Sequence, residues 1–237
     1  MSLRAVLFDA GNTLVFLDYG RMAEGVSAAL GIPLSGDALE AHASEASRAM
    51  EQASGNDQHR AAAYLEALFR LAGVPLDRMR EVRQHLLTMH QERHLWSSVR
   101  PRTVESLSKL RAAGLRLGIV SNSDGRVDEA LTAAGLRQYF DVVVDSALVG
   151  IEKPNPAIFL AALDALGVAP EEALYVGDLY EVDVVGAQAA GMEAVLLAEC
   201  AEPGRACRTA PSINELVNTL LQPENTMRPP SIRTRTL

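Results

Sequence analysis

Short apolar segments alternate with helical segments along most of this 237-residue chain, and no other feature constrains its fold as strongly. The apolar segments are rich in Val, Ile, Leu and Ala, which is typical of strands that are buried on both faces of a parallel sheet. They lie near residues 4–8, 115–121, 142–145, 173–177 and 194–198. The helical stretches lie near residues 103–113, 126–134, 156–166, 181–190 and 212–221. This series predicts an α/β fold with a doubly wound, Rossmann-like parallel sheet.

Glycines mark the ends of several of these predicted helices. A residue in the left-handed conformation commonly ends a helix, and glycine adopts it without a steric penalty. The glycines in question are Gly114, Gly135, Gly167 and Gly191.

Residues 16–98 interrupt the alternation. They show helical periodicity, as in Met22, Val26 and Leu30, without a credible strand between the helices. We therefore predict an inserted all-α domain at 16–98 and a core domain formed by residues 1–15 and 99–221. Residues 222–237 contain three prolines and few large apolar side chains, which predicts a flexible tail.

Charge and hydropathy argue against several classes of protein. The 22 basic and 30 acidic residues give a net charge of -8, which disfavours nucleic-acid binding. No apolar run approaches the ~18 residues that a membrane span needs, and the first apolar stretch is interrupted at Asp9, too early for a signal peptide. Cys200 and Cys207 lack metal-site spacing, which predicts reduced thiols. We expect a cytoplasmic protein without nucleic-acid or membrane partners; oligomeric state has no sequence signal.

Polar residues follow the predicted strands, where ligands bind in open parallel sheets. The stretches are FDAGNTLV (8–15), IVSNSDG (119–125), IEKPNP (151–156) and YVGDLYEVD (175–183). A carboxylate at Asp9 can attack phosphorus and form an aspartyl-phosphate, although a strand-end Asp also often caps a turn. Asp178 beside Asp9 and a phosphate calls for a hard cation, which predicts Mg²⁺. Asp183 would orient these groups, or simply begin the next helix.

Three further residues are candidates for phosphate binding. Ser121 and Asn122 supply a hydroxyl and backbone N–H groups next to a predicted helix start, although Ser is as common as a plain helix cap. Lys153 is one of only two lysines among 22 basic residues, and it could balance the charge around Asp9.

The four stretches resemble, in order and spacing, the four motifs of the haloacid dehalogenase-like hydrolase superfamily, over roughly residues 4–200. The insertion resembles the cap of that family's first cap class (C1). The resemblance implies a magnesium-dependent phosphatase that acts on a small phosphorylated compound through Asp9. It also implies the remaining roles: Mg²⁺ ligation by Asp9, Asp178 and the Gly11 carbonyl, support by Asp183, and phosphate binding by Ser121, Asn122 and Lys153.

Gly11 departs from the family pattern. Family phosphatases usually carry a second Asp at this position, which protonates the leaving group and later activates water. General acid–base catalysis contributes about 10² to 10⁴ in rate, so alkyl phosphates should suffer most and aryl or acyl phosphates and anhydrides least. Asp18 and Tyr19 are the nearest candidates for a replacement.

Other functions remain open at this point. One is a weakly active or non-catalytic regulatory protein of the same fold that binds phosphate and metal. A second is a haloacid dehalogenase, against which the GDxxxxD pattern of Asp178 and Asp183 counts. Phosphonatases need a cap lysine, and residues 16–98 contain none; transporting ATPases need a membrane span. Among His85, His90 and His94, the last two are four residues apart and could share a helix face, but without a matching carboxylate or Cys we predict a solvated face rather than a zinc site.

Overall fold

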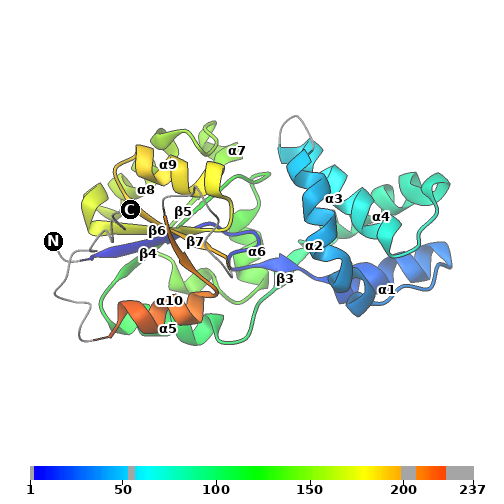
Figure 1. Cartoon of the computed structure of the whole chain (residues 1–237), viewed down its shortest axis with the longest axis horizontal. Helices are drawn as coiled ribbons and strands as arrows, with labels where there is room; N and C mark the ends of the chain where they lie inside the picture. The colour runs from blue at the N-terminus through cyan, green and yellow to red at the C-terminus, as the bar shows by residue number, and fades with distance from the viewer. Residues whose placement is uncertain (1–2, 53–56, 199–206, 223–237) are drawn as a thin grey trace, which may run out of the picture. The chain divides into compact units, whose positions relative to one another are not determined.

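The computed structural model describes residues 3–52, 57–198 and 207–222 (Figure 1). Two compact units are present. Phe16–Ser98 forms one, here called the helical unit, and the segments before and after it together form the other, the α/β unit. The predicted flexible tail lies outside the described residues except for Gln222, and so does Cys200.

A six-stranded sheet, with every neighbouring pair parallel, forms the centre of the α/β unit. The strand order is β5-β4-β1-β6-β7-β8. The strands are β1 (Ala5–Phe8), β4 (Arg116–Ser121), β5 (Val142–Asp145), β6 (Ala173–Gly177), β7 (Glu193–Leu197) and β8 (Arg208–Ala210). The predicted doubly wound α/β sheet is therefore confirmed; the three-residue edge strand β8 was not predicted.

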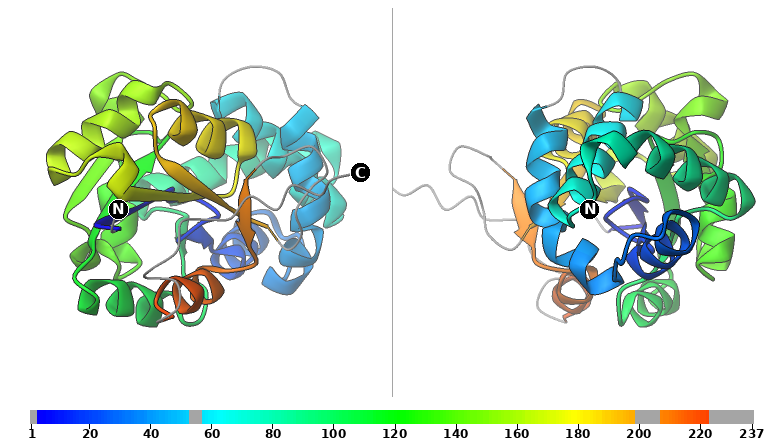
Figure 2. Two further views of the ribbon diagram at one scale, coloured as in Figure 1. Left: turned by 60° about the vertical axis from the view of Figure 1, so that its left-hand side comes forward. Right: turned by 90° about the vertical axis from the view of Figure 1, so that its right-hand side faces the viewer.

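Helices cover both faces of this sheet. In Figure 2 the pair α8 and α9 lies on one face and the pair α5 and α10 on the other. The helices are α5 (Thr103–Ala112), α6 (Val127–Ala133), α7 (Ser146–Val149), α8 (Pro156–Leu166), α9 (Val185–Ala189) and α10 (Ile213–Leu220). Short turns are η2 (Arg137–Tyr139), η3 (Pro170–Glu172) and η4 (Tyr180–Val184). The four glycines predicted to end helices all have positive φ, as expected.

One predicted helix has a different structure. The stretch 181–190 begins with the π-helical turn η4 and continues as the short α9, instead of forming one regular helix. A π turn inserts an extra residue and is frequent at functional sites. Here it contains Asp183, whose backbone N–H donates to the Leu179 carbonyl at 2.8 Å.

The topology brings the ends of three strands together. β1 lies between β4 and β6, and the chain reaches β4 first and crosses to β6 later. This is a topological switch point, where open α/β sheets bind their ligands. Asp9, Ser121 and Asp178 stand at the carboxyl ends of β1, β4 and β6 respectively.

The helical unit has its own apolar core. Its helices are α1 (Tyr19–Leu30), α2 (Gly36–Gln52), α3 (Asp57–Leu71) and α4 (Met79–Glu92), with the turn η1 (Leu76–Arg78) before α4. Met22, Val26, Leu68, Phe69 and Val82 are among its buried side chains. Two strands, β2 (Phe16–Leu17) and β3 (Trp96–Ser98), pair antiparallel. They were not predicted, because strands of two or three residues are too short to show a periodic pattern in the sequence. No helix in the described part of the chain is long and apolar enough to span a membrane.

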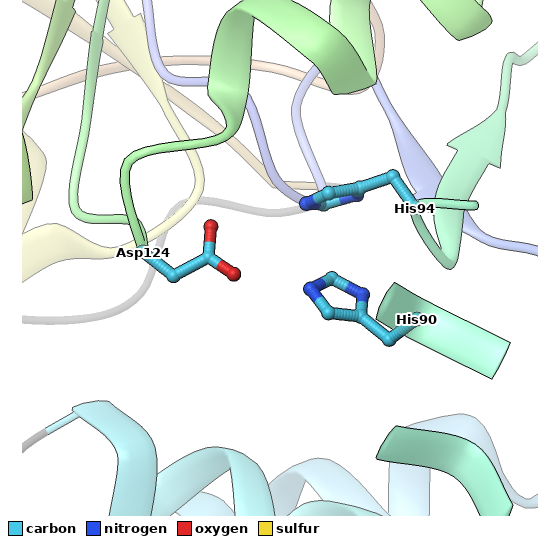
Figure 3. A group of neighbouring side chains, drawn as sticks. All are labelled: His90, His94 and Asp124. Carbon is cyan, nitrogen blue, oxygen red and sulfur yellow. The ribbon is translucent and has the colours of Figure 1, made fainter. Parts of the chain in front are cut away.

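The prediction of a solvated histidine face is wrong for His94. Helix α4 ends at Glu92, so His94 follows the helix instead of lying on it, and its side chain is buried. The rings of His90 and His94 lie close together, with centroids 4.3 Å apart (Figure 3). Backbone N–H groups of the following residues, Leu95 and Trp96, donate to His90 Nδ1 and His94 Nδ1 respectively, each at 3.3 Å.

Candidate active site

Asp9 and Lys153 form a buried ion pair at the end of β1. The ammonium Nζ of Lys153 donates to Asp9 Oδ1 at 2.6 Å, and the two side chains are only 2% and 11% exposed. The backbone of Asp9 is held as well, since its N–H donates to the Val176 carbonyl of β6 at 2.9 Å. The nucleophile predicted from the sequence thus has a defined position.

The Lys153 ammonium has three acceptors in this cluster. Besides Asp9 it donates to Asp183 Oδ1 at 2.7 Å and to the Tyr175 hydroxyl at 3.1 Å. An ammonium carries three N–H donors, so all of them have partners. Burial opposes the charged form, but the charges of Asp183 and Asp9 outweigh it and raise the pKa of Lys153 well above its ordinary value.

Asp183 connects this lysine to the loop after β6. Its Oδ2 accepts the backbone N–H groups of Asp178 at 3.1 Å and Leu179 at 2.9 Å. Gly177 makes this close packing feasible, because a Cβ at that position would lie 2.6 Å from the Asp183 Cβ and closer still to its carboxyl group. Both Asp183 oxygens are therefore engaged by protein groups.

Three carboxylates converge at the site. One oxygen each from Asp9, Asp178 and Asp183 lie within 4.8 Å of one another. Burial raises the pKa of Asp9 to about 6, although Lys153 counteracts it. Burial, together with the charges of Asp9 and Asp183, raises the pKa of Asp178 well above its ordinary value. Crowded, dehydrated oxygen donors of this kind fit a hard divalent cation such as Mg²⁺.

The turn after β1 is closed by backbone hydrogen bonds. The N–H groups of Leu14 and Val15 both donate to the Ala10 carbonyl at 2.9 Å, and the Asn12 N–H donates to the Val15 carbonyl at 2.9 Å. Asn12 has a φ of 53°, the left-handed region that Asn tolerates better than most residues. Gly11, whose carbonyl is the predicted Mg²⁺ ligand, lies inside this tight turn.

Asn122 contacts the backbone of Lys153. Its Nδ2 donates to the Lys153 carbonyl at 3.0 Å, and its Oδ1 accepts the Lys153 N–H at 2.8 Å. The Asn122 side chain thus fixes the main chain of Lys153. The part of Asn122 that is suited to a ligand is its own main chain. Ser121 is buried at the end of β4.

Another buried carboxylate, Asp145, holds the loop that follows Ser121 and Asn122. It accepts the backbone N–H groups of Gly125 at 3.1 Å, Val127 at 3.1 Å and Ala147 at 3.0 Å. Sequence reasoning missed both Asp145 and Tyr175. Asp145 could have been found because it is a charged residue at the end of a strand that is otherwise all Val. Tyr175 could have been found because it is the one phenol in an aliphatic strand, and a buried hydroxyl needs a hydrogen-bond partner.

The two candidates for a replacement acid have local partners within the helical unit. Asp18 begins α1, and its Oδ1 accepts the Arg21 N–H at 3.0 Å. The hydroxyl of Tyr19 lies 2.6 Å from that of Tyr64, and burial and this contact raise the pKa of Tyr64.

Comparison with known sequences identifies related proteins. A family model described as haloacid dehalogenase-like hydrolase matches residues 3–191. Glyceraldehyde 3-phosphate phosphatase of Methanopyrus kandleri is 32% identical over 203 residues, which cover 81% of this chain and 83% of the relative. Haloacid dehalogenase-like hydrolase domain-containing protein 3 of Mus musculus is 41% identical over 131 residues, 55% of this chain and 52% of the relative. The match thus spans about half the length of the mouse protein.

Solved structures of two kinds are similar to this chain. A HAD phosphatase from Thermococcus onnurineus is 30% identical with a TM-score of 0.59, and the match covers 92% of this chain and 98% of that one. The L-2-haloacid dehalogenase RSc1362 is 26% identical with a TM-score of 0.62, and the match covers 93% and 99%.

Proposed function

The chain belongs to the haloacid dehalogenase-like hydrolase family, and from this we propose that it is a magnesium-dependent phosphatase of a small phosphorylated compound. The observation that carries the proposal is the carboxylate cluster around Asp9. Lys153 holds Oδ1 of Asp9. One oxygen each from Asp9, Asp178 and Asp183 lie within 4.8 Å of one another. Such a cluster suits a cation and a phosphate group together.

Asp9 is the proposed nucleophile. Lys153 donates to Oδ1, and we assign the attack to the other oxygen, Oδ2. A bond forms between Oδ2 and phosphorus while the bond from phosphorus to the leaving oxygen breaks, and that oxygen departs with the electron pair. Water then attacks the aspartyl-phosphate, which releases phosphate and restores Asp9. The fixed position of Asp9 lowers the entropy cost of the first step.

The cation site consists of Asp9, Asp178 and the Gly11 carbonyl in this proposal. Asp183 supports the cation site without binding the cation in this proposal, because both of its oxygens accept hydrogen bonds from protein groups. Bound Mg²⁺ would offset the negative charge of the carboxylates and the phosphate. The raised pKa values of Asp9 and Asp178 support this assignment, since burial and, next, the neighbouring carboxylates disfavour the charged forms, which a bound cation would stabilise.

Phosphate oxygens are assigned to the Ser121 hydroxyl and the main chain of Asn122, while the Lys153 ammonium, whose three N–H groups are engaged by Asp9, Asp183 and Tyr175, attracts the phosphate through its positive charge. Ser121 pairs in register with Asp145, so the carboxylate that fixes the following loop stands directly beside it in the sheet. The Asn122 side chain contributes indirectly, through the Lys153 backbone.

Gly11 and the related proteins favour different leaving groups. Gly11 supplies no proton donor, which favours substrates whose leaving oxygen is stable as an anion, such as acyl and aryl phosphates or anhydrides. The Methanopyrus kandleri relative is named for a small sugar phosphate. We propose the first class as the better substrates, and a panel containing both classes compares them directly.

The first experiment is Mg²⁺-dependent release of p-nitrophenol from p-nitrophenyl phosphate. We expect turnover in the wild type, loss of at least about 10³-fold in Asp9→Asn, and no loss in Asp164→Asn, which makes the same change on the exposed surface of α8. Asp18→Asn and Tyr19→Phe test whether either residue replaces the missing acid.

Other outcomes would assign the site differently. Binding of orthophosphate and Mg²⁺ without turnover of any substrate in the panel would indicate a regulatory protein that retains the pocket. Metal-independent halide release from a 2-haloacid, abolished by Asp9→Asn, would indicate a dehalogenase. The GDxxxxD pair of Asp178 and Asp183 argues against the dehalogenase, because that reaction needs no cation for Asp178 to bind.

A further inference from the structure

The hydroxyl group of Tyr175 lies in the interior of the α/β unit. Tyr175 lies in β6, the neighbour of β1, and its side chain is fully buried. The hydroxyl oxygen is 3.0 Å from the Val120 carbonyl, 3.1 Å from Lys153 Nζ and 3.2 Å from Asp183 Oδ1. Burying a hydroxyl is unfavourable unless it is hydrogen-bonded, and here it has three partners.

The direction of each hydrogen bond follows from counting protons. The Lys153 ammonium can only donate, so the Tyr175 oxygen accepts from it. The one hydroxyl proton remains for the Val120 carbonyl or for Asp183 Oδ1. Val120 precedes Ser121 in β4, so the phenol connects the lysine of one motif to the strand that carries another.

The phenol ring is itself held firmly. Its edge contact with Phe159 of α8 has a centroid separation of 4.9 Å and an interplanar angle of 77°. Phe159 in turn packs against Gly186 of α9, where a Cβ would lie 2.7 Å from the ring. A rigid ring gives its hydroxyl a fixed place, so the acceptor that it offers to Lys153 does not move.

We propose that Tyr175 is a positioning residue that fixes the Lys153 ammonium on the Asp9 carboxylate. With Asp9 and Asp183 alone, one of the three N–H groups of the buried ammonium would have no acceptor in this cluster; the Tyr175 oxygen supplies it, so the ammonium is held on three sides. The inference rests on the proposed function, in which Lys153 acts on Asp9. Tyr175 does not touch the reacting atoms, so it acts through the lysine.

Tyr175→Phe tests this with little change in volume. We expect kcat with p-nitrophenyl phosphate to fall about tenfold and KM to stay within about twofold, because the phosphate contacts of Ser121 and the Asn122 main chain remain and only the lysine loses an acceptor. Tyr139→Phe, at a half-buried tyrosine of the same unit, is the matched control and should leave both constants unchanged.

A second measurement is independent of turnover. The chain has two lysines, so ¹⁵N-lysine labelling gives two ammonium signals. Lys109, on the surface beside Glu105, is the internal reference. We expect hydrogen exchange of the Lys153 ammonium to accelerate about tenfold in Tyr175→Phe, while Lys109 does not change.

These results separate the two proposals. Failure of the wild type to hydrolyse any substrate would refute the proposed function, yet the exchange measurement would still test Tyr175. Unchanged exchange and unchanged kcat in Tyr175→Phe would overturn the positioning role. If that variant does not accumulate as a folded protein, the wild type still provides a test: a nuclear Overhauser contact between the Lys153 ammonium and the Tyr175 ring is expected, and its absence would overturn the role.

Discussion

Gly177 lies against Asp183, and any side chain at this position would displace the carboxylate. A Cβ would lie 2.6 Å from the Asp183 Cβ, which is closer than real contacts allow. Gly177→Ala should therefore weaken both the Lys153 ion pair and the loop after β6. We expect a loss of about 2 kcal/mol or more in the free energy of unfolding, measured with urea, and a large loss of phosphatase activity.

Gly20→Ala is the matched control for this prediction. At Gly20 in α1 an added Cβ would have its nearest contact 3.6 Å away, at Asp18 Oδ1, which is ordinary van der Waals distance. Alanine is also the better helix former by about 1 kcal/mol, so stability should stay equal or rise. Equal effects of the two substitutions would show that the packing against Asp183 is unimportant.

Binding of Mg²⁺ should depend on pH because the carboxylates compete for protons. Burial raises the pKa of Asp9 from 3.8 to about 6, so the site retains a proton at pH values where an exposed Asp has lost it. A cation must displace that proton, and affinity should therefore rise with pH through about 6. Calorimetric titration should give binding at least about tenfold weaker at pH 5 than at pH 7.5, with the raised pKa of Asp178 adding to the difference. Affinity that does not vary with pH would argue against Asp9 as a ligand.

At the level of secondary-structure elements, the turn between β5 and α7 supports the loop after β4. Asp145 accepts backbone N–H groups on both sides of this contact, at Gly125 and Val127 in the loop and at Ala147 in α7. Ser146 adds to it, since its Oγ accepts the Ser123 N–H at 3.1 Å. The loop that follows Ser121 is thus held from a neighbouring strand.

Asp145→Ala should loosen this loop and weaken phosphate binding. Removal of the carboxylate leaves three backbone N–H groups without their acceptor, which we expect to lower the free energy of unfolding by about 2–4 kcal/mol. Orthophosphate affinity, measured by calorimetry in the presence of Mg²⁺, should fall about tenfold. Asp164→Ala on the exposed face of α8 is the control, and a similar loss there would mean that the effect is not specific to the loop.

At the level of the whole molecule, each unit has a separate apolar core. The only tryptophan of the chain, Trp96, lies in β3 and packs against the core of the helical unit, so its fluorescence reports on that unit. Backbone circular dichroism follows both units. We expect two thermal transitions, with different midpoint temperatures for the two probes. Orthophosphate with Mg²⁺ should raise the midpoint of the α/β unit, which is seen by circular dichroism, and leave the midpoint seen by fluorescence unchanged. Coincident transitions that shift together would contradict this.

Local patterns along the chain were sufficient to predict the sheet of the α/β unit and the residues at its strand ends. Continuous apolarity identified β1, β4, β5, β6 and β7, because a strand buried on both faces has no room for polar side chains. Since parallel strands present their carboxyl ends at one edge, Asp9 and Asp178 could be placed near one another before any coordinates were known. The short strands β2, β3 and β8 were not predicted, because two or three residues are too few to show periodicity.

The partners of each side chain required the folded molecule. Lys153 was expected near Asp9, but its bonds to Asp183 and Tyr175 join residues 30 and 22 positions away. Asn122 was expected at the phosphate through backbone N–H groups, but the bonds of its side chain to the Lys153 backbone were not predicted. Periodicity reports whether a side chain is buried, while a hydrogen bond depends on the relative placement of elements to within a few tenths of an ångström. Tertiary packing sets that placement, which is why the residue types at this site follow from the sequence and their hydrogen-bond network does not.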